Sequence, residues 1–200
     1  MAFLRSGIGL ESGPVVRGHG VLLRPPTMGD YGAWAELRAM SRDHLSPWEP
    51  TWARDELTRG AFRRRLRFYQ REAREDLGHS FFILHEPTGA LIGGLTLSNL
   101  RRGVTQAASL GYWMGKPYAN RGLMRSAVSA VQTFAVDGLR LHRLEAACMP
   151  TNLPSIRVLE GCGFTREGFA RQYLKINGRW EDHILFGFVE GDARTRETRA

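Results

Sequence analysis

The chain is poor in cysteine, in lysine and in long apolar runs. Its 200 residues contain only Cys148 and Cys162, which are too few for a disulfide framework and lack partners at metal-ligand spacing. No apolar run approaches the roughly 20 residues of a membrane-spanning helix, and the first residues lack the sustained apolar core of a signal peptide. These absences predict a cytoplasmic protein with reduced thiols, no metal ion and no membrane contact.

Low-complexity linkers and internal repeats are also absent, and 42% hydrophobic residues suffice for one domain with a core. We expect that domain to span residues 15–189, after an N-terminal extension of residues 1–14. Residues 190–200 form a charged tail with almost nothing to bury, so it should fray. We expect a monomer or a weak dimer.

Because lysine is nearly absent, the net charge of +8 comes from arginine. Seven arginines lie in residues 59–74, where Phe62, Leu66, Tyr69 and Ala73 form an apolar stripe at helical spacing. Acidic residues in and after this stretch can offset part of the charge by pairing along the helix. This helix is therefore either a solvated face or a patch that attracts RNA phosphates, and salt would weaken the latter contact.

The most informative stretch combines a strand, a turn and a helix. Residues 110–114 favour a short apolar strand, residues 115–122 a tight polar turn, and residues 123–134 a helix that ends near Gly138. Backbone N–H groups and a helix N-terminus around one point suit a phosphate or pyrophosphate. An ordinary strand–turn–helix link remains the alternative.

The downstream sequence continues the pattern. Residues 144–149 favour a second strand and residues 155–160 a short helix, which stops at residues 161–164. Two further strands, within residues 172–186, are joined by Asn177 and Gly178. Asn-Gly between two such runs predicts a hairpin with a type I′ turn.

In this order and spacing the chain resembles the GNAT family of acetyl-CoA-dependent N-acetyltransferases, and within it the RimJ-type branch that acetylates ribosomal-protein N-termini. The resemblance covers about residues 15–189 and implies an α/β (α+β) fold whose mixed, mostly antiparallel central sheet is splayed at the acetyl-CoA cleft and flanked by helices. The motifs that carry it are residues 22–25, 44–50, 91–94, 98–99, 111–112, 120–124, 142–143, 149–152, 163–164, 167–168 and 177–183.

The resemblance implies a cofactor site. Backbone groups of Trp113 and Met114 would polarise the thioester carbonyl, and Asn152 would contact the cofactor arm. The pyrophosphate would bind to the loop and helix start formed by Ala119, Asn120, Arg121, Gly122, Leu123 and Met124. The chain departs from the family pattern here: Ala119 replaces a glutamine or arginine, and Asn120 replaces a glycine. Backbone donors need no particular side chain, so binding should survive.

Two proton transfers must also be assigned. By resemblance Ser155 protonates the departing thiolate, although Ser155 and Asn152 also suit helix capping. A two-residue turn would place Tyr173 opposite Asp182, which gives either a site pair with Asp182 as base or a hydrogen bond that fixes the register. Cys148, at a strand end, is either a thiol nucleophile or a small buried hydrophobe.

The acceptor pocket falls in the early helical region. Glu49 could hold the incoming ammonium group and Trp48 could line the pocket, together with Tyr173. By resemblance the acceptor is the N-terminus of an alanine-starting ribosomal protein, attacked directly without an acetyl-enzyme. Alternatives are a small amine or amino acid, or a docking protein of little activity whose Arg59–Arg74 helix contacts ribosomal RNA.

Overall fold

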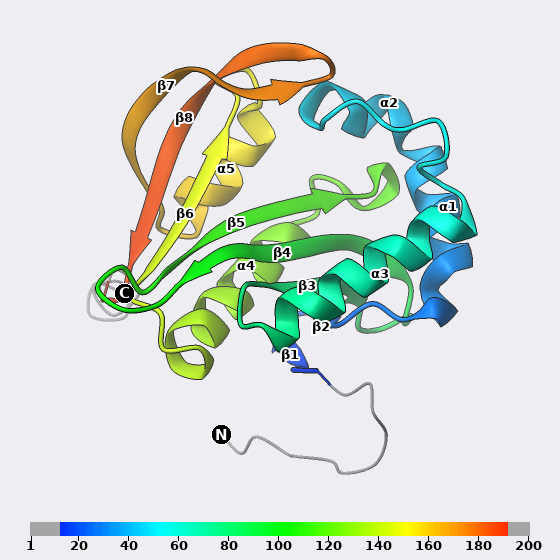
Figure 1. Cartoon of the computed structure of the whole chain (residues 1–200), viewed down its shortest axis with the longest axis horizontal. Coiled ribbons are helices and arrows are strands. Elements are labelled where there is room, and N and C mark those ends of the chain that lie inside the picture. Colours follow the sequence, from blue (N-terminus) through cyan, green and yellow to red (C-terminus); the bar gives the residue numbers. More distant parts are fainter. Residues whose placement is uncertain (1–12, 192–200) are drawn as a thin grey trace.

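The computed structural model describes residues 13–191 of the chain. Its centre is one eight-stranded sheet with the strand order β1-β2-β3-β4-β5-β6-β8-β7 (Figure 1). All neighbouring strands are antiparallel except β5 and β6, which confirms the expected mixed, mostly antiparallel sheet. The strands are β1 Val16–Gly18, β2 Val21–Arg24, β3 His79–His85, β4 Leu91–Arg101, β5 Ala107–Met114, β6 Arg143–Cys148, β7 Thr165–Ile176 and β8 Arg179–Val189.

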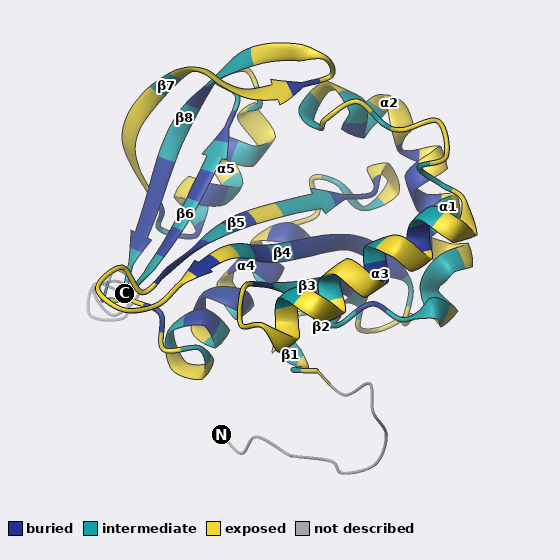
Figure 2. Ribbon diagram, in the orientation of Figure 1, coloured by how far each residue is buried: buried dark blue, intermediate teal, exposed yellow. Residues whose placement is uncertain are grey.

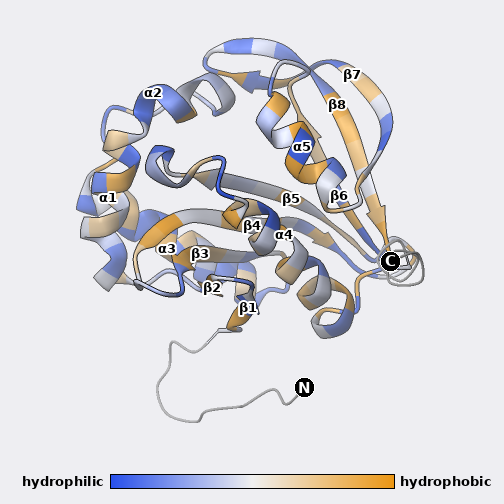
Figure 3. Cartoon of the chain, turned by 180° about the vertical axis from the view of Figure 1, so that it is seen from behind, coloured by the Kyte–Doolittle hydropathy of each residue, from blue (hydrophilic) through white to orange (hydrophobic). Residues whose placement is uncertain are grey.

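Helices cover both faces of this sheet. Helix α3 packs against β3 and helix α4 against β1 and β2, and Figures 1 and 3 show the two helices on opposite faces. The α-helices are α1 Tyr31–Met40, α2 Arg42–Leu45, α3 Arg59–Arg74, α4 Leu123–Thr133 and α5 Leu153–Gly161. Shorter helical turns are Met28–Asp30, Ser46–Trp48, Lys116–Tyr118 and Phe134–Gly138.

The core has two parts, because each face of the sheet buries its own cluster of apolar side chains. The larger part lies between the sheet and helices α4 and α5, and includes Val128, Val131 and Leu159. The smaller part lies under α1 and α3 and includes Trp34 and Phe62. Figure 2 shows the resulting pattern, with buried residues along the central strands and exposed residues along the outer side of α3.

The sheet is splayed at its only parallel pair within the described residues. Strands β5 and β6 are paired only from Ala107 to Ser109 on β5, whereas β5 continues to Met114. Beyond Ser109, β5 remains paired to β4 and β6 to β8, so the sheet opens between its two halves. The splay expected from the resemblance is confirmed, and it positions the site described below.

The β7–β8 hairpin forms as expected at its turn. Asn177 has a φ of 43° and Gly178 a φ of 84°, so both central residues adopt the positive φ that a type I′ turn requires. Ile176 faces Arg179, as the turn predicts. The register then shifts between Ala170 and Leu174, so the pairing that the turn predicts does not continue beyond Leu174.

The expected N-terminal extension and charged tail lie outside the described residues, apart from residues 13–14 and 190–191. Within residues 13–191 the strands run from Val16 to Val189. No helix in this described part is long and apolar enough to cross a membrane.

Candidate active site

A cleft of about 370 Å³ opens where β5 and β6 diverge, and this volume lies within the range of small-molecule sites. On its β6 side, the part of β5 from Leu110 onward has no strand partner. Backbone N–H and C=O groups need partners when they are buried, so this edge is available to a ligand. The lining includes every residue predicted to contact the cofactor: Trp113, Met114, Ala119, Asn120, Arg121, Gly122, Leu123, Met124, Asn152 and Ser155.

The N-terminus of α4 points its backbone donors at this cleft. The N-cap is Gly122, with a φ of 77° and no side-chain cap, so the first N–H groups of the helix have no capping partner. By contrast, Thr58 caps α3 and Asn152 caps α5. An uncapped helix start with its positive dipole end in a cleft can bind an anion.

The departure at Asn120 has a structural explanation. Asn120 has a φ of 59°, in the left-handed region where glycine is the usual residue. Asparagine is among the few other residues that tolerate this region, because its short polar side chain can hydrogen-bond locally. The loop therefore keeps the backbone conformation that a glycine would give, and the substitution leaves the donors of the loop unchanged.

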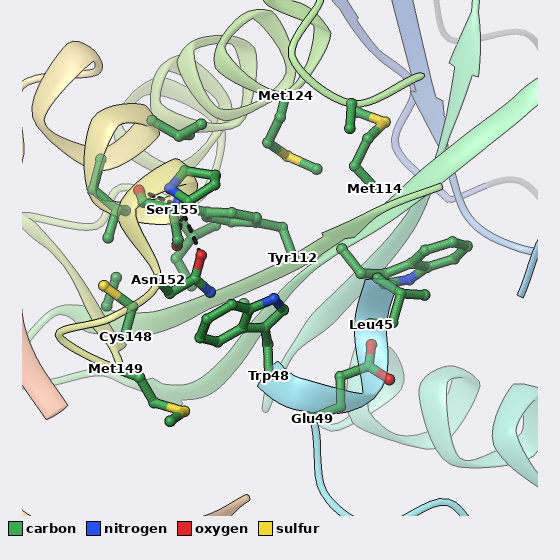
Figure 4. A pocket seen from close by; sticks show the side chains of 18 of the residues that line it. Leu45, Trp48, Glu49, Tyr112, Met114, Met124, Cys148, Met149, Asn152 and Ser155 are labelled. Carbon is green, nitrogen blue, oxygen red and sulfur yellow. Dashed lines mark hydrogen bonds between the residues drawn. The ribbon is translucent and has the colours of Figure 1, made fainter. Parts of the chain in front are cut away.

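Two hydroxyl groups meet on the opposite wall. The hydroxyl of Tyr112, on β5, lies 2.8 Å from Oγ of Ser155 and donates to the carbonyl of Ser155 at 3.2 Å (Figure 4). The side-chain oxygen of Asn152 accepts the backbone N–H of Ser155 at 3.2 Å, so Asn152 and not the hydroxyl of Ser155 caps the helix. Burial raises the pKa of Tyr112 well above its usual value, so its hydroxyl stays protonated.

Cys148 also lines this wall, near Met149 and Asn152 in Figure 4. Burial raises the pKa of its thiol to about 11, an effect that a hydrogen bond with Ser155 only partly opposes. A thiol with this pKa is almost fully protonated at neutral pH, and the thiolate is the reactive form. Of the two interpretations of Cys148, the small buried hydrophobe is therefore favoured over the nucleophile.

Glu49 lies at the far end of the cleft, next to Trp48, on the segment after α2 (Figure 4). Its carboxylate accepts two hydrogen bonds of 2.7 Å from Arg38 and one of 2.7 Å from the indole of Trp52. Arg38 is buried and its guanidinium also lies over the rings of Trp52 and Trp113. This revises the expected role of Glu49: its negative charge is already neutralised, and the residue acts as an anchor for the loop.

The expected pairing of Tyr173 with Asp182 is wrong. A bulge with Gln172 at a φ of 48° interrupts the ladder, and the backbone N–H of Gln172, not Tyr173, bonds Asp182 at 2.8 Å. The ring of Tyr173 packs against His183 instead, with centroids 5.8 Å apart. Neither Tyr173 nor Asp182 belongs to the described lining of the cleft, whereas His183 does.

A regular hairpin register places His183 on the face opposite to Asp182. His183 is buried, 3% exposed, and lines the cleft, with Nδ1 2.9 Å from the carbonyl of Glu181. Because a carbonyl only accepts hydrogen bonds, Nδ1 must carry the proton in this contact, which leaves Nε2 as a lone-pair acceptor in the neutral ring. This makes His183 a candidate base.

The hairpin tip also closes one side of the cleft. The backbone N–H of Asn177 donates to the carbonyl of Glu49 at 2.9 Å, and Figure 1 shows the end of the hairpin next to α2. The cleft is therefore bridged by two segments that are far apart in the sequence. Among residues 13–191, no group of His, Cys, Asp and Glu side chains is arranged to hold a metal ion.

A family model for the acetyltransferase (GNAT) domain matches residues 21–165, which include β5, the loop before α4 and helix α5. The chain belongs to the GNAT acetyltransferase family. GNAT acetyltransferases use acetyl-CoA. The resemblance to the GNAT family that the motifs indicated is thereby confirmed.

Relatives extend the match over nearly the whole domain. The probable N-acetyltransferase YjcK of Bacillus subtilis (strain 168) is 36% identical over 178 residues, covering 89% of this chain and 98% of that protein. The [ribosomal protein uS5]-alanine N-acetyltransferase of Escherichia coli (strain K12) is 32% identical over 165 residues, covering 82% and 85%.

Solved structures give the same assignment. The ribosomal-protein-S5-alanine acetyltransferase of Vibrio fischeri superposes with a TM-score of 0.83 at 31% identity, covering 90% of this chain and 98% of that one. Mycobacterium smegmatis RimJ in complex with CoA-disulfide also has a TM-score of 0.83, at 29% identity, with 93% of each chain covered.

Three residues of this site were not assigned a role from the sequence: Arg38, Tyr112 and His183. Tyr112 belongs to a motif that supports the resemblance, but nothing local indicates that its hydroxyl reaches Ser155, 43 positions later. Arg38 lies on an ordinary helix pattern, and only its burial distinguishes it from the other arginines.

Proposed function

We propose that this protein transfers an acetyl group from acetyl-CoA to the N-terminal α-amine of a protein, and that the acceptor is a ribosomal protein whose chain begins with alanine. The observation that carries the chemistry is the convergence of an uncapped helix start, an unpaired strand edge and a buried hydroxyl pair at one cleft. The Escherichia coli and Vibrio fischeri relatives, which act on alanine of a ribosomal protein, support the acceptor. Such an acceptor places the reaction in the cytoplasm.

The cleft divides the task of holding acetyl-CoA between its two walls. The loop and helix start of residues 119–124 hold the pyrophosphate through backbone N–H groups and the helix dipole. The free edge of β5 at Trp113 and Met114 holds the arm and directs an N–H group at the thioester carbonyl. Acetyl-CoA itself supplies an acetyl group that is already activated as a thioester.

Proton transfer is assigned to the hydroxyl pair and to His183. Ser155 gives its proton to the departing sulfur, and Tyr112 orients the Ser155 hydroxyl through their 2.8 Å contact. An α-amine has a pKa of about 7.7–8.0, so a fair fraction is already neutral and a weak base suffices. We assign that base to His183 rather than Asp182, because His183 lines the cleft and Asp182 caps the bulge at Gln172.

The attack is direct, with no acetyl-enzyme. Cys148 is the cysteine of the cleft lining, and its pKa of about 11 keeps it protonated. Trp48 forms the wall on the acceptor side, and the Arg38–Glu49 pair holds that wall in place. Amine and thioester therefore meet between the two walls and react in one step.

The proposal is tested with synthetic peptides that copy ribosomal-protein N-termini, incubated with the protein and acetyl-CoA and analysed by mass spectrometry. We expect one added acetyl group on the α-amine of an alanine-starting peptide, and none on the same peptide with a dimethylated N-terminus. Acetylation of the lysine side chains instead, or of small amines only, would overturn the proposed acceptor.

Two glycine variants connect the activity to the cleft. Gly122→Trp places a bulky side chain at the N-cap of α4 and should abolish transfer. Gly103→Trp is the matched control, because both glycines have positive φ, 77° and 65°, and open space around them, but Gly103 lies outside the cleft lining. If both variants lose activity equally, the loss reflects the backbone strain and not the cofactor site.

A further inference from the structure

Helix α3 is the most strongly basic element of the described chain. Its 16 residues contain seven arginines and one acidic residue, Glu72. Six of these arginines are exposed, and Arg65 is half-buried and paired with Glu56. The outer side of α3, here called the arginine face, consists of Arg59, Arg63, Arg64, Arg67, Phe68, Arg71 and Arg74.

Most of this charge is not neutralised by neighbours. Arg64 is paired with Asp55, whereas Arg63, Arg67 and Arg74 have no ion-pair partner among residues 13–191. Arg59 and Arg71 lie over aromatic rings, which leaves their positive charge in place. Against these five guanidinium groups, the acidic residues near the end of the helix are Glu72, Glu75 and Asp76, and Asp76 is already paired with Arg102. The surface field above α3 is therefore positive, and it attracts a polyanion.

The arginine face also presents an aromatic ring. The side chain of Phe68 is 49% exposed, with the guanidinium of Arg71 over its ring at 5.4 Å. About half of this side chain is accessible to a planar partner on the same surface as the arginines. Unpaired bases stack on aromatic rings and on arginine planes, while their phosphates pair with the cations alongside.

We propose that the arginine face of α3 is a docking surface for single-stranded RNA. The arginines contact phosphates along the roughly 22 Å of the helix, following its 1.5 Å rise per residue, and Phe68 stacks against an unpaired base. The choice of RNA among polyanions rests on the proposed ribosomal acceptor, whose neighbours in the particle are RNA. Docking here leaves the site open, because no residue of α3 lines the cleft.

The surface is built so that it can be altered without disturbing the core. The buried side of α3, with Phe62 and Leu66, packs into the cluster under α1, and the arginine face points outward (Figure 2). Substitutions of exposed arginines should therefore leave the fold and the cleft intact. RNA binding and acetyl transfer can then be measured separately on the same full-length chain.

The test is fluorescence anisotropy of a labelled, unstructured RNA across a range of salt concentrations. We expect the triple variant Arg63→Gln, Arg67→Gln, Arg71→Gln to bind this RNA at least about tenfold more weakly than the wild-type protein. The slope of log K against log salt should also become less steep by about 2, since each phosphate contact on a single strand contributes about 0.7 to that slope. The control is Arg140→Gln, Arg171→Gln, Arg179→Gln, three exposed residues outside α3 with the same loss of charge.

A second variant tests the stacking. Phe68→Ala should weaken binding to the unstructured RNA by about tenfold and change binding to a fully paired RNA duplex much less. Equal losses in the arginine triple and its control would overturn the docking surface, because net charge alone would then explain binding. Binding of acidic peptides or anionic vesicles without binding of RNA would also overturn it.

The two proposals fail separately. Lost RNA binding in the arginine-face triple, together with normal acetylation of a free peptide, supports an RNA-docking surface apart from the active site. Absence of RNA binding in the wild-type protein, with peptide acetylation intact, overturns the docking surface alone. RNA binding without acetylation of any peptide overturns the proposed function alone.

Discussion

The guanidinium of Arg38 and the carboxylate of Glu49 form two parallel hydrogen bonds of 2.7 Å that connect α1 to the end of the cleft. Trp52 donates a third bond to the same carboxylate, and Trp113 of β5 lies under the guanidinium. The pair thus ties the wall of the cleft that includes Trp48 to strand β5. A bidentate pair of this kind holds the two segments that carry it in a fixed relative position.

Removing Arg38 should therefore destabilise the protein. Arg38→Gln leaves the carboxylate of Glu49, only 20% exposed, without its cation. We expect the free energy of unfolding in urea to fall by about 3 kcal/mol. The control is Arg17→Gln, which breaks an exposed pair with Glu86 and should cost less than about 1 kcal/mol. Equal losses in both variants would contradict the structural role of the Arg38 pair.

Ser155→Ala separates catalysis from helix capping, because the cap of α5 is Asn152. We expect kcat for peptide acetylation to fall by about a hundredfold, with little change in the KM for acetyl-CoA. Tyr112→Phe, which keeps the ring but removes the hydroxyl that orients Ser155, should lower kcat less. Asn152→Ala should instead lower stability by about 1 kcal/mol. An unchanged kcat in Ser155→Ala would remove the serine from the chemistry.

The thiol of Cys148 should react slowly at neutral pH. Burial raises its pKa to about 11, so the thiolate fraction increases about tenfold per pH unit up to that value. The variant Cys162→Ala leaves Cys148 as the single cysteine. We expect its rate of alkylation by iodoacetamide to rise continuously from pH 7 to about pH 10. A rate that levels off near pH 8 would show a reactive thiolate and reopen the acetyl-enzyme route.

Stability should decline as the pH falls below 6.5 because of His79. Burial lowers the pKa of His79. The charge of Asp76 partly opposes this shift, and the charge of Arg102 adds to it. As the pH falls, His79 therefore takes up a proton in the unfolded chain before it does so in the folded chain. The contribution of neutral His79 to the free energy of unfolding is complete above pH 6.5, and it is lost as the pH falls towards the pKa of His79 in the folded chain. One proton gives a slope of at most about 1.4 kcal/mol per pH unit.

Urea titrations between pH 7.5 and 5 measure this effect. His79→Gln should flatten the pH dependence of the free energy of unfolding, while His19→Gln, at an exposed position, should not. The same slope in His79→Gln and in the wild-type protein would assign the pH dependence to other groups.

Local patterns predicted the parts of this molecule that local physics determines. The Asn177-Gly178 turn, the strand before the phosphate-type loop and the start of α4 follow from turn chemistry and apolar periodicity. The mixed, mostly antiparallel sheet and its splay came from the resemblance and not from periodicity. All residues expected to contact the cofactor line one cleft, because they lie on elements whose order the motifs define.

Long-range effects explain what the sequence concealed. The hairpin turns the face that carries Leu174, Ile176 and His183 towards the cleft, so His183 lines it and Asp182 does not. No residue near position 172 in the sequence predicts a positive φ for Gln172. Arg38 and Glu49 are 11 positions apart on separate elements, and their pairing depends on how α1 packs. Partnerships of this kind form only when the chain has folded.

The parallel ladder between β5 and β6 stops after Ser109, so the sheet has an unfinished seam in its interior. Most sheets expose unpaired backbone only at their outer margins. A ligand that hydrogen-bonds along β5 completes the architecture as well as filling the site, and its binding adds RT ln(1 + [L]/Kd) to the free energy of unfolding. In a GNAT acetyltransferase that ligand is acetyl-CoA. Acetyl-CoA should therefore raise the free energy of unfolding once its concentration exceeds Kd.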